Sequence, residues 1–278
     1  MADDGVELWF EVTGDGDGVP LVLCHGGPGM WDNLGPLATL LDHDRAVVRW
    51  DQRGCGRSGG AEGPFSLEQS LTDLDAIRRH LGLARWIVGG HSWGASLALR
   101  AVLADRTSAA GLLYLSGTGL GRSWHLAYTA APAERLTADQ LARCHELDAT
   151  TNRTRAEETE WRALRWAPDF ADRRRALELA SIDAGAPWPV NLTCNAAINA
   201  ETKTWDMAAI RDRCTSLGVP ALLVHGEHDP RPPFAIDDLV AALPDATVEI
   251  IEDAGHLPWL ERPGAVAAVL RPWLAARG

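Results

Sequence analysis

Three residues that lie far apart in the sequence could form a nucleophilic triad. Gly90-His91-Ser92-Trp93-Gly94 has the form G-x-S-x-G, which places a serine on a sharp turn between a strand and a helix. Asp229 and His256 follow it in the chain order that such a serine uses. In this set Ser92 would attack an acyl carbon and His256 would carry the proton. Asp229 would orient the imidazole and stabilise its charged form.

The pattern alone does not identify the nucleophile, because Gly56-Arg57-Ser58-Gly59-Gly60 matches it as well. Ser58 leads into Ala61-Glu62-Gly63-Pro64, which is not helical text. Ser92 instead lies between an apolar run and a helical pattern, and this context favours it.

The acid and the base both have competitors in the sequence. Four other histidines lie at or near the carboxyl ends of apolar runs that we expect to be strands: His25, His91, His225 and His228. Glu252 and Asp253 are alternative acids, but they precede His256 by only four and three residues, which is too close to reach its ring easily. Asp229 and His256 each follow a different apolar run, and we therefore prefer them.

A metal site is the alternative use of the same segment. His225-x-x-His228-Asp229 offers ligand types, but no carboxylate or third histidine stands at a matching helix spacing. The five cysteines form no C-x-x-C pair and are odd in number. We therefore expect no metal, no disulfide framework and a reducing, cytoplasmic setting.

An acyl-transfer site also needs two N–H donors for the developing oxyanion. One donor should be the amide of Trp93, directly after the nucleophile. The second should come from the loop His25-Gly26-Gly27-Pro28-Gly29, where glycines let the backbone approach a substrate, and we select Gly27.

Apolar runs alternate with helical patterns over most of the chain. Strands are expected at 8–12, 20–24, 46–50, 85–90, 110–115, 221–224 and 247–251, with a turn at 14–18, and helices at 66–80, 93–103, 234–243 and 265–276. Strands that are apolar on both faces and separated by helices predict an α/β fold with a parallel sheet covered on both sides. Catalytic groups then converge at the carboxyl ends of the strands.

The alternation stops between residues 119 and 213. This stretch has no convincing buried strand and reads as helices, for example over 156–165 and 171–180. We predict a core domain made of 1–118 and 214–278, with a helical cap inserted at 119–213. Five of the twelve tryptophans are in the cap, where they either pack it onto the core or line a pocket for a bulky apolar group: Trp124, Trp161, Trp166, Trp188 and Trp205.

Net charge and the length of the apolar runs narrow the classes of partner that the chain could bind. The net charge is −12, and residues 119–213 carry only −1 of it, so the core is acidic and phosphate-backbone binding is not expected. The longest apolar runs, such as 221–224, are too short to span a bilayer, and the acidic start Met1-Ala2-Asp3-Asp4 does not resemble a signal peptide. We expect a small-molecule or short-peptide substrate.

Several segments resemble a known family. The stretches 25–29, 51–58 and 89–94 (HGGPG, DQRGCGRS and GGHSWG) look like those of prolyl aminopeptidases, also called proline iminopeptidases. The stretch 255–263 (GHLPWLERP) is similar to the histidine region of α/β hydrolases at large. The resemblance implies an α/β-hydrolase fold, with a mostly parallel central sheet flanked by helices and an inserted helical cap. It also implies a Ser-His-Asp hydrolase without a cofactor that removes N-terminal proline from peptides.

The resemblance further implies that cap carboxylates bind the free amino group of the substrate, one of them in a Trp-Glu pair. Neither Trp161 nor Trp166 is followed by Glu here, so Glu160, Glu157 and Glu201 are the candidates. Together with His91, beside the nucleophile, the two tryptophans complete the predicted substrate-binding set.

Two other functions remain open. The same triad could act on a hydrophobic ester, a lactone or a natural-product intermediate, with acyl transfer or cyclisation in place of hydrolysis. The chain could also be a non-catalytic, ligand-binding member of the fold.

Overall fold

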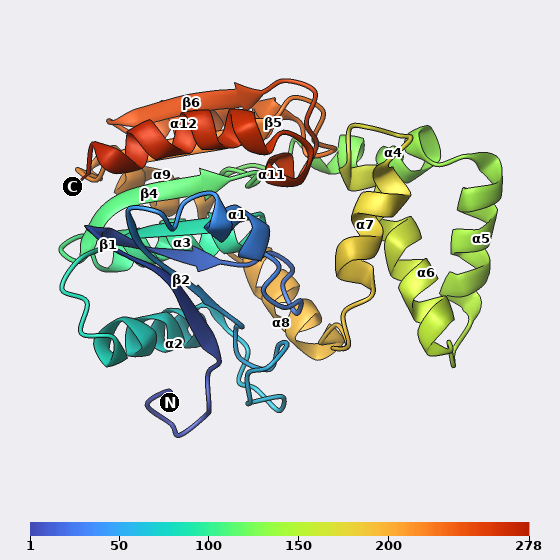
Figure 1. Ribbon diagram of the computed structural model, residues 1–278, viewed down its shortest axis with the longest axis horizontal. Coiled ribbons are helices and arrows are strands. Elements are labelled where there is room, and N and C mark those ends of the chain that lie inside the picture. The colour runs from blue at the N-terminus through green and yellow to red at the C-terminus, as the bar shows by residue number, and fades with distance from the viewer. Residues whose placement is uncertain (278) are drawn as a thin grey trace.

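The apolar runs of the sequence form the strands of one sheet. The computed structural model describes residues 1–277, and its strand order is β2-β1-β3-β4-β5-β6 (Figure 1). The strands are β1 (Phe10–Cys24), β2 (Arg45–Trp50), β3 (Trp86–His91), β4 (Ala109–Leu115), β5 (Ala221–Gly226) and β6 (Ala246–Ile251). Every residue of β3, β4 and β5 is buried, which is why these strands are apolar apart from His91 and His225 near the ends of β3 and β5.

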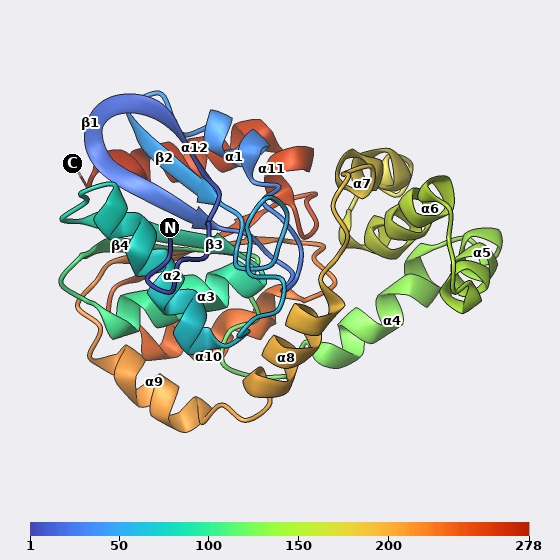
Figure 2. The same cartoon turned by 90° about the horizontal axis from the view of Figure 1, so that it is seen from below.

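The first strand differs from the prediction. Residues 14–18 were expected to be a turn between two strands, but they belong to the single long strand β1. The N–H of Gly18 still donates a hydrogen bond to the oxygen of Asp44, so this glycine-rich stretch keeps pairing. The partners on β2 first run backwards, from Trp50 to Val47, and then forwards again, as the broad curve of β1 shows (Figure 2). The other strand pairs are parallel, and the sheet is therefore mostly parallel.

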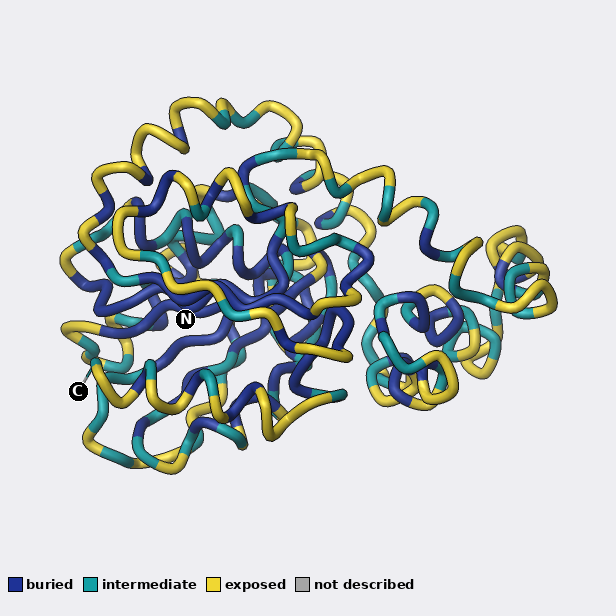
Figure 3. Tube along the Cα trace, turned by 90° about the horizontal axis from the view of Figure 1, so that it is seen from above, coloured by how far each residue is buried: buried dark blue, intermediate teal, exposed yellow. Residues whose placement is uncertain are grey.

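Helices cover both faces of the sheet (Figure 2). One face carries α2 (Leu67–His80), α3 (Trp93–Ala104), α9 (Met207–Thr215) and α10 (Asp237–Ala242), and the other carries α1 (Gly35–Thr39), α11 (Pro258–Glu261) and α12 (Pro263–Ala275). A short 3₁₀ turn, η2 (Pro233–Ile236), precedes α10. Alternate residues of β1 point to opposite faces: Leu21 and Leu23 pack with α1 and α12, whereas Val22 and Cys24 pack with α2 and α3. The central strands are accordingly the most buried part of the chain (Figure 3).

Residues 119–213, the predicted cap, form helices joined by loops and contain no strand. The cap contains α4 (His125–Arg135), α5 (Ala138–Ala149), α6 (Arg155–Trp166), η1 (Ala167–Asp169), α7 (Ala176–Ala184) and α8 (Leu192–Thr202). Thr137 and Thr154 begin α5 and α6 with complete capping boxes. The predicted helix at 171–180 begins only at Ala176, because the N–H groups of Ala171 and Asp172 bond to the side chain of Glu261 instead.

Apolar packing joins the cap to the core. Phe170 and Leu179 of the cap share a buried cluster with Leu257 and Trp259 of the core. Helix α9 contains the predicted cap limit at residue 213, yet it packs in the core cluster beside α10. None of the helices over residues 1–277 is both long and apolar enough to cross a membrane.

Candidate active site

Ser92 lies on the sharp turn that the sequence predicts. It follows β3 directly and precedes α3, and its backbone has φ 56° and ψ −118°. A Cβ on Gly90 would lie 2.0 Å from the oxygen of Gly94, and one on Gly94 would lie 2.0 Å from the oxygen of Cys24. Both glycines are therefore required for the strand and the helix to approach one another.

Asp229 and His256 lie in contact. Nδ1 of His256 is 2.7 Å from Oδ2 of Asp229, and both side chains are buried. A carboxylate can only accept here, so Nδ1 carries the hydrogen and Nε2 is left free to take a proton. The N–H of Arg231 donates to the other oxygen of Asp229 at 2.8 Å. Ser92 and His256 line the same cavity.

Burial sets the protonation of this pair. It raises the pKa of Asp229 to about 6, although the charges of His225 and Arg231 act in the opposite direction. Burial also lowers the pKa of His256 well below its usual range, and the charge of Arg231 adds to that effect. At pH 7 the carboxylate is therefore ionised and the imidazole neutral, which is the state that a general base needs.

The competing histidines occupy other positions. His25 accepts a hydrogen bond from the N–H of Gln52 at 3.0 Å and donates to the oxygen of Gly26, so it supports the glycine-rich loop. Nε2 of His225 is 2.6 Å from the oxygen of Arg231 and 3.3 Å from Asp229. His91 packs against His256, with 4.5 Å between ring centres. His228 is exposed, as are the alternative acids Glu252 and Asp253.

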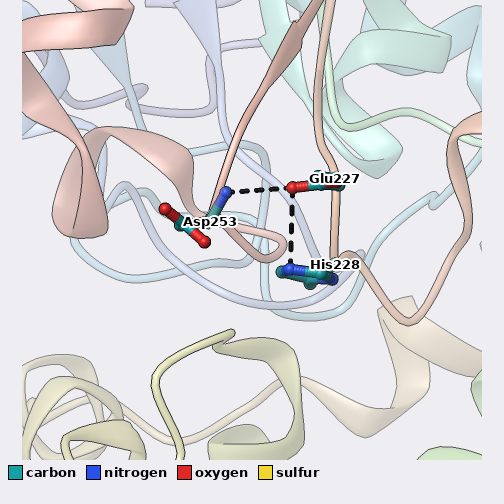
Figure 4. Close-up of side chains that lie close together, drawn as sticks. All are labelled: Glu227, His228 and Asp253. Carbon is teal, nitrogen blue, oxygen red and sulfur yellow. Dashed lines mark hydrogen bonds and ion pairs between the residues drawn. The ribbon is translucent and has the colours of Figure 1, made fainter.

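Three exposed residues form a cluster on the loops that follow β5 and β6. Glu227, His228 and Asp253 offer ligand atoms within 4.8 Å of one another (Figure 4). Oε2 of Glu227 already accepts from the N–H of Asp253 at 3.2 Å and lies 3.6 Å from Nε2 of His228. His225 and Asp229, by contrast, are buried and lie 3.3 Å apart, so the segment His225-x-x-His228-Asp229 does not converge on one point.

The predicted oxyanion donors are Gly27, which lines the same cavity as Ser92, and Trp93, which follows Ser92 directly. Gly27 lines the cavity with φ 123°, and Trp93 is the first residue of α3, where N–H groups have no partner within the helix. The last cap helix holds the loop of Gly27. Asn195 donates from Nδ2 to the oxygen of Pro28, and the N–H of Asn191 donates to the oxygen of Gly29, both at 2.8 Å.

The cavity above Ser92 has a volume of about 250 Å³ and lies between the core and the cap. Its apolar lining includes five aromatic residues: Trp31, Tyr128, Trp161, Trp166 and Phe170. Its polar lining includes Asn33, Asp169, Asp183, Asn195 and Arg231. This combination suits a small substrate that has both an apolar body and a polar group.

The structure brings only part of the predicted substrate-binding set to this cavity. His91, Trp161 and Trp166 line it. Glu160 instead pairs with Arg143 at 2.8 Å on an exposed face of the cap, and Glu201 accepts a hydrogen bond from the N–H of Leu67. Glu160 and Glu201 were therefore misplaced by sequence reasoning, because both carboxylates have protein partners away from the cavity.

The third candidate, Glu157, accepts from the N–H of Thr154 and so caps α6. The carboxylates that line the cavity are Asp169 and Asp183, which sequence reasoning did not select. Asp169 forms an ion pair with Arg231. Asp183 accepts a hydrogen bond from Nδ2 of Asn33 at 2.7 Å, and burial raises its pKa.

Comparison with known proteins decides the family. The model of the alpha/beta hydrolase fold family matches residues 19–263. This chain is an α/β hydrolase. The proline iminopeptidase of Xanthomonas citri is 30% identical to the hydrolase over 297 residues, which cover 97% of this chain and 92% of the relative. The proline iminopeptidase of Xylella fastidiosa is 29% identical, and the match covers 91% of this chain and 88% of the relative.

Solved structures share the fold. The proline iminopeptidase of Mycobacterium smegmatis superposes on the hydrolase with a TM-score of 0.72 and 22% identity, over 98% of this chain and 96% of the other. A thermophilic esterase from Thermogutta terrifontis gives a TM-score of 0.75 and 24% identity, over 100% of this chain and 96% of the esterase. The hydrolase thus resembles proline iminopeptidases in sequence, and its fold is common to peptidases and esterases.

Proposed function

We propose that this enzyme is a serine hydrolase in which Ser92, His256 and Asp229 form the catalytic triad. The contact of 2.7 Å between Nδ1 of His256 and Oδ2 of Asp229, buried and adjoining the cavity of Ser92, carries the proposal. The backbone of Ser92 supports it, because a positive φ in a non-glycine residue is characteristic of this type of nucleophile.

In the proposed reaction, Oγ of Ser92 attacks the carbonyl carbon of the substrate, and its proton passes to Nε2 of His256. Asp229 stabilises the imidazolium that results. The N–H groups of Gly27 and Trp93 bind the oxyanion, and the loss of one such donor costs ~10²–10³ in rate. His256 then protonates the leaving group. Water, activated by the same imidazole, releases the acyl group from Ser92.

A fluorophosphonate probe tests this assignment, since it phosphonylates an activated serine and needs no knowledge of the substrate. The wild-type protein should be labelled on Ser92, and Ser92→Ala should not react. An unlabelled wild type, or a Ser92→Ala protein with full turnover, would contradict the triad and favour a non-catalytic, ligand-binding protein.

For the substrate, we infer a small amide with an N-terminal proline, as the relatives' names suggest. An N-terminal proline is a small apolar ring that carries a positive charge. Aromatic rings and an unpaired carboxylate together suit such a group. Asp183 supplies that carboxylate: its partner Asn33 is neutral, whereas Asp169 is already paired with Arg231.

A hydrophobic ester or lactone is the second candidate. The aromatic residues of the cavity favour it. Turnover of proline arylamides should be compared with turnover of aryl esters of similar size. Efficient cleavage of the arylamide supports the aminopeptidase. Cleavage of esters alone supports the alternative.

The compartment is also part of the proposal. All five cysteines are buried and free. Free thiols support the prediction of a reducing, cytoplasmic setting, in which peptides and small metabolites are the available substrates.

A further inference from the structure

A segment of the cap is hydrogen-bonded directly to the loop that carries the proposed base. The main-chain oxygen of Asp169 accepts the N–H of His256 at 2.7 Å. This bond joins η1 of the cap to the residue whose side chain would move the proton.

Glu261, on α11, strengthens the same junction. Its Oε1 accepts the N–H groups of Ala171 and Asp172 at 2.8 and 3.0 Å, and its Oε2 accepts the N–H of Gly255 at 2.6 Å. One carboxylate therefore binds two residues of the cap and the residue that precedes His256. Bonds from N–H groups to an ionised carboxylate are stronger than those to a neutral acceptor.

The two segments approach so closely that a side chain at position 255 would not fit. A Cβ on Gly255 would lie 2.2 Å from the oxygen of Asp169 and 2.9 Å from the nitrogen of Ala171. Phe170, between those two residues, is 2% exposed and packs in the cluster that contains Trp259. The cap segment is thus held by main-chain bonds on one side and by an apolar anchor within it.

The acid of the triad is tied to the same segment. The side chain of Asp169 pairs with Arg231, and the N–H of Arg231 donates to Asp229 at 2.8 Å. Arg135 of α4 adds two bonds, to the oxygens of Pro168 at 2.7 Å and His228 at 2.9 Å. The cap therefore contacts the loops of both the acid and the base.

We infer that Glu261 is a positioning residue, which holds the cap segment Asp169–Asp172 against the His256 loop and so fixes the imidazole for proton transfer. The inference rests on the proposed triad. Without the carboxylate, the N–H groups of Gly255, Ala171 and Asp172 lose their acceptor, and the segment that anchors the N–H of His256 is released. A misplacement of about 1 Å can cost ~10²-fold in rate.

Two substitutions and one control test this role. Glu261→Ala removes all three acceptor contacts. Glu261→Gln keeps one oxygen, so it can serve either the two cap N–H groups or Gly255 but not both. Glu252→Gln is the matched control, because it removes a carboxylate from an exposed position four residues before His256. Each protein is first compared by thermal unfolding, and rates are normalised to the folded fraction.

The readouts are the rate of fluorophosphonate labelling at Ser92, over a series of probe concentrations, and hydrogen exchange at 169–172 and 255–257. The maximal labelling rate should fall at least about tenfold in Glu261→Ala and less in Glu261→Gln, with the half-saturating probe concentration unchanged. Exchange should increase in both segments together. The control should match the wild type in every measurement.

Unchanged labelling per folded molecule in Glu261→Ala would overturn the inference, as would faster exchange in only one segment. A wild-type protein that the probe does not label would instead refute the proposed triad. In that case the exchange data still decide whether Glu261 couples the cap to the His256 loop.

Discussion

The imidazole of His91 lies 4.5 Å from that of His256, between ring centres, and its Nε2 is 2.9 Å from the main-chain oxygen of His256. The ring of Trp259 packs edge-on against that of His91, with 4.8 Å between ring centres. The residue before the proposed nucleophile is therefore packed against the proposed base. Because a carbonyl oxygen only accepts, Nε2 of His91 carries the hydrogen of this bond.

We predict that His91→Ala lowers the labelling rate of Ser92 about tenfold, because the loop of His256 loses a hydrogen bond and a packing partner. His91→Gln should lose less, since its amide can donate to the same oxygen. His43→Ala, at an exposed position, is the control and should react like the wild type. Equal rates for all three variants would show that His91 has no influence on the base.

The pH dependence of labelling should reflect the neutral form of His256. Because burial lowers the pKa of His256, the active form persists below the ordinary histidine value of about 6.5 and is lost only as the pH falls further. Asp229, with a pKa raised to about 6, titrates in the same range, so the observed midpoint belongs to the pair. A rate profile between about pH 4.5 and 8 measures it. A midpoint above 6.5 would contradict the assignment.

Asp229→Asn should reduce turnover about 10⁴-fold while the fold is retained. The amide cannot stabilise the imidazolium, and it favours the wrong tautomer of His256. Asp253→Asn is the control, because its carboxylate is exposed and lies 3.5 Å from Arg262. Steady-state rates and circular dichroism of the two variants provide the comparison. A larger loss in Asp253→Asn would reverse the choice of acid.

Asp183→Asn should raise KM for a proline arylamide at least about tenfold and leave KM for an aryl ester unchanged, because only the amine needs the charge. Amine binding should also weaken as the pH falls, since the raised pKa of Asp183 brings its protonation closer to neutrality. Glu178→Gln, on an exposed face of the same helix, is the control. Equal losses with both substrates would indicate a structural role for Asp183.

Gly94→Ala should lower the free energy of unfolding by about 3 kcal/mol or prevent folding, because the new methyl group would lie 2.0 Å from the oxygen of Cys24. Gly264→Ala is the matched control in α12. A Cβ there has no neighbour within 4 Å, and the change should be neutral or stabilising by up to about 1 kcal/mol. Urea unfolding of the three proteins measures the difference. A mild effect at Gly94 would contradict the packing described for the elbow.

The sequence was most informative where chemistry depends on local backbone. The parallel sheet and the family are confirmed. The nucleophile turn could be recognised because Gly90 and Gly94 are sterically required on either side of Ser92. The triad itself stays a prediction, although Asp229 and His256 are in contact as expected.

The cap was much less predictable. Glu160 and Glu201 were chosen as carboxylates of the predicted cap, but which side of a helix faces a cavity depends on how helices pack, and no motif records it. Asp183 has no local signature at all. Arg231 had a weak signature in the sequence. It follows Asp229 by two residues and is the arginine or lysine nearest to Asp229 along the chain.

Main-chain atoms of the cap form many of its bonds to the active-site loops, namely the oxygen of Asp169 and the N–H groups of Ala171, Asp172 and Asn191. Such bonds constrain the path of the chain and not the identity of the side chains. Ala171 and Asp172 can therefore diverge in type among related enzymes. Asp169 and Phe170 are constrained as well by the ion pair of one side chain and the burial of the other, and insertions or deletions over 169–172 should be disfavoured. For the same reason, a cap grafted from another hydrolase should support turnover only if its backbone follows this course.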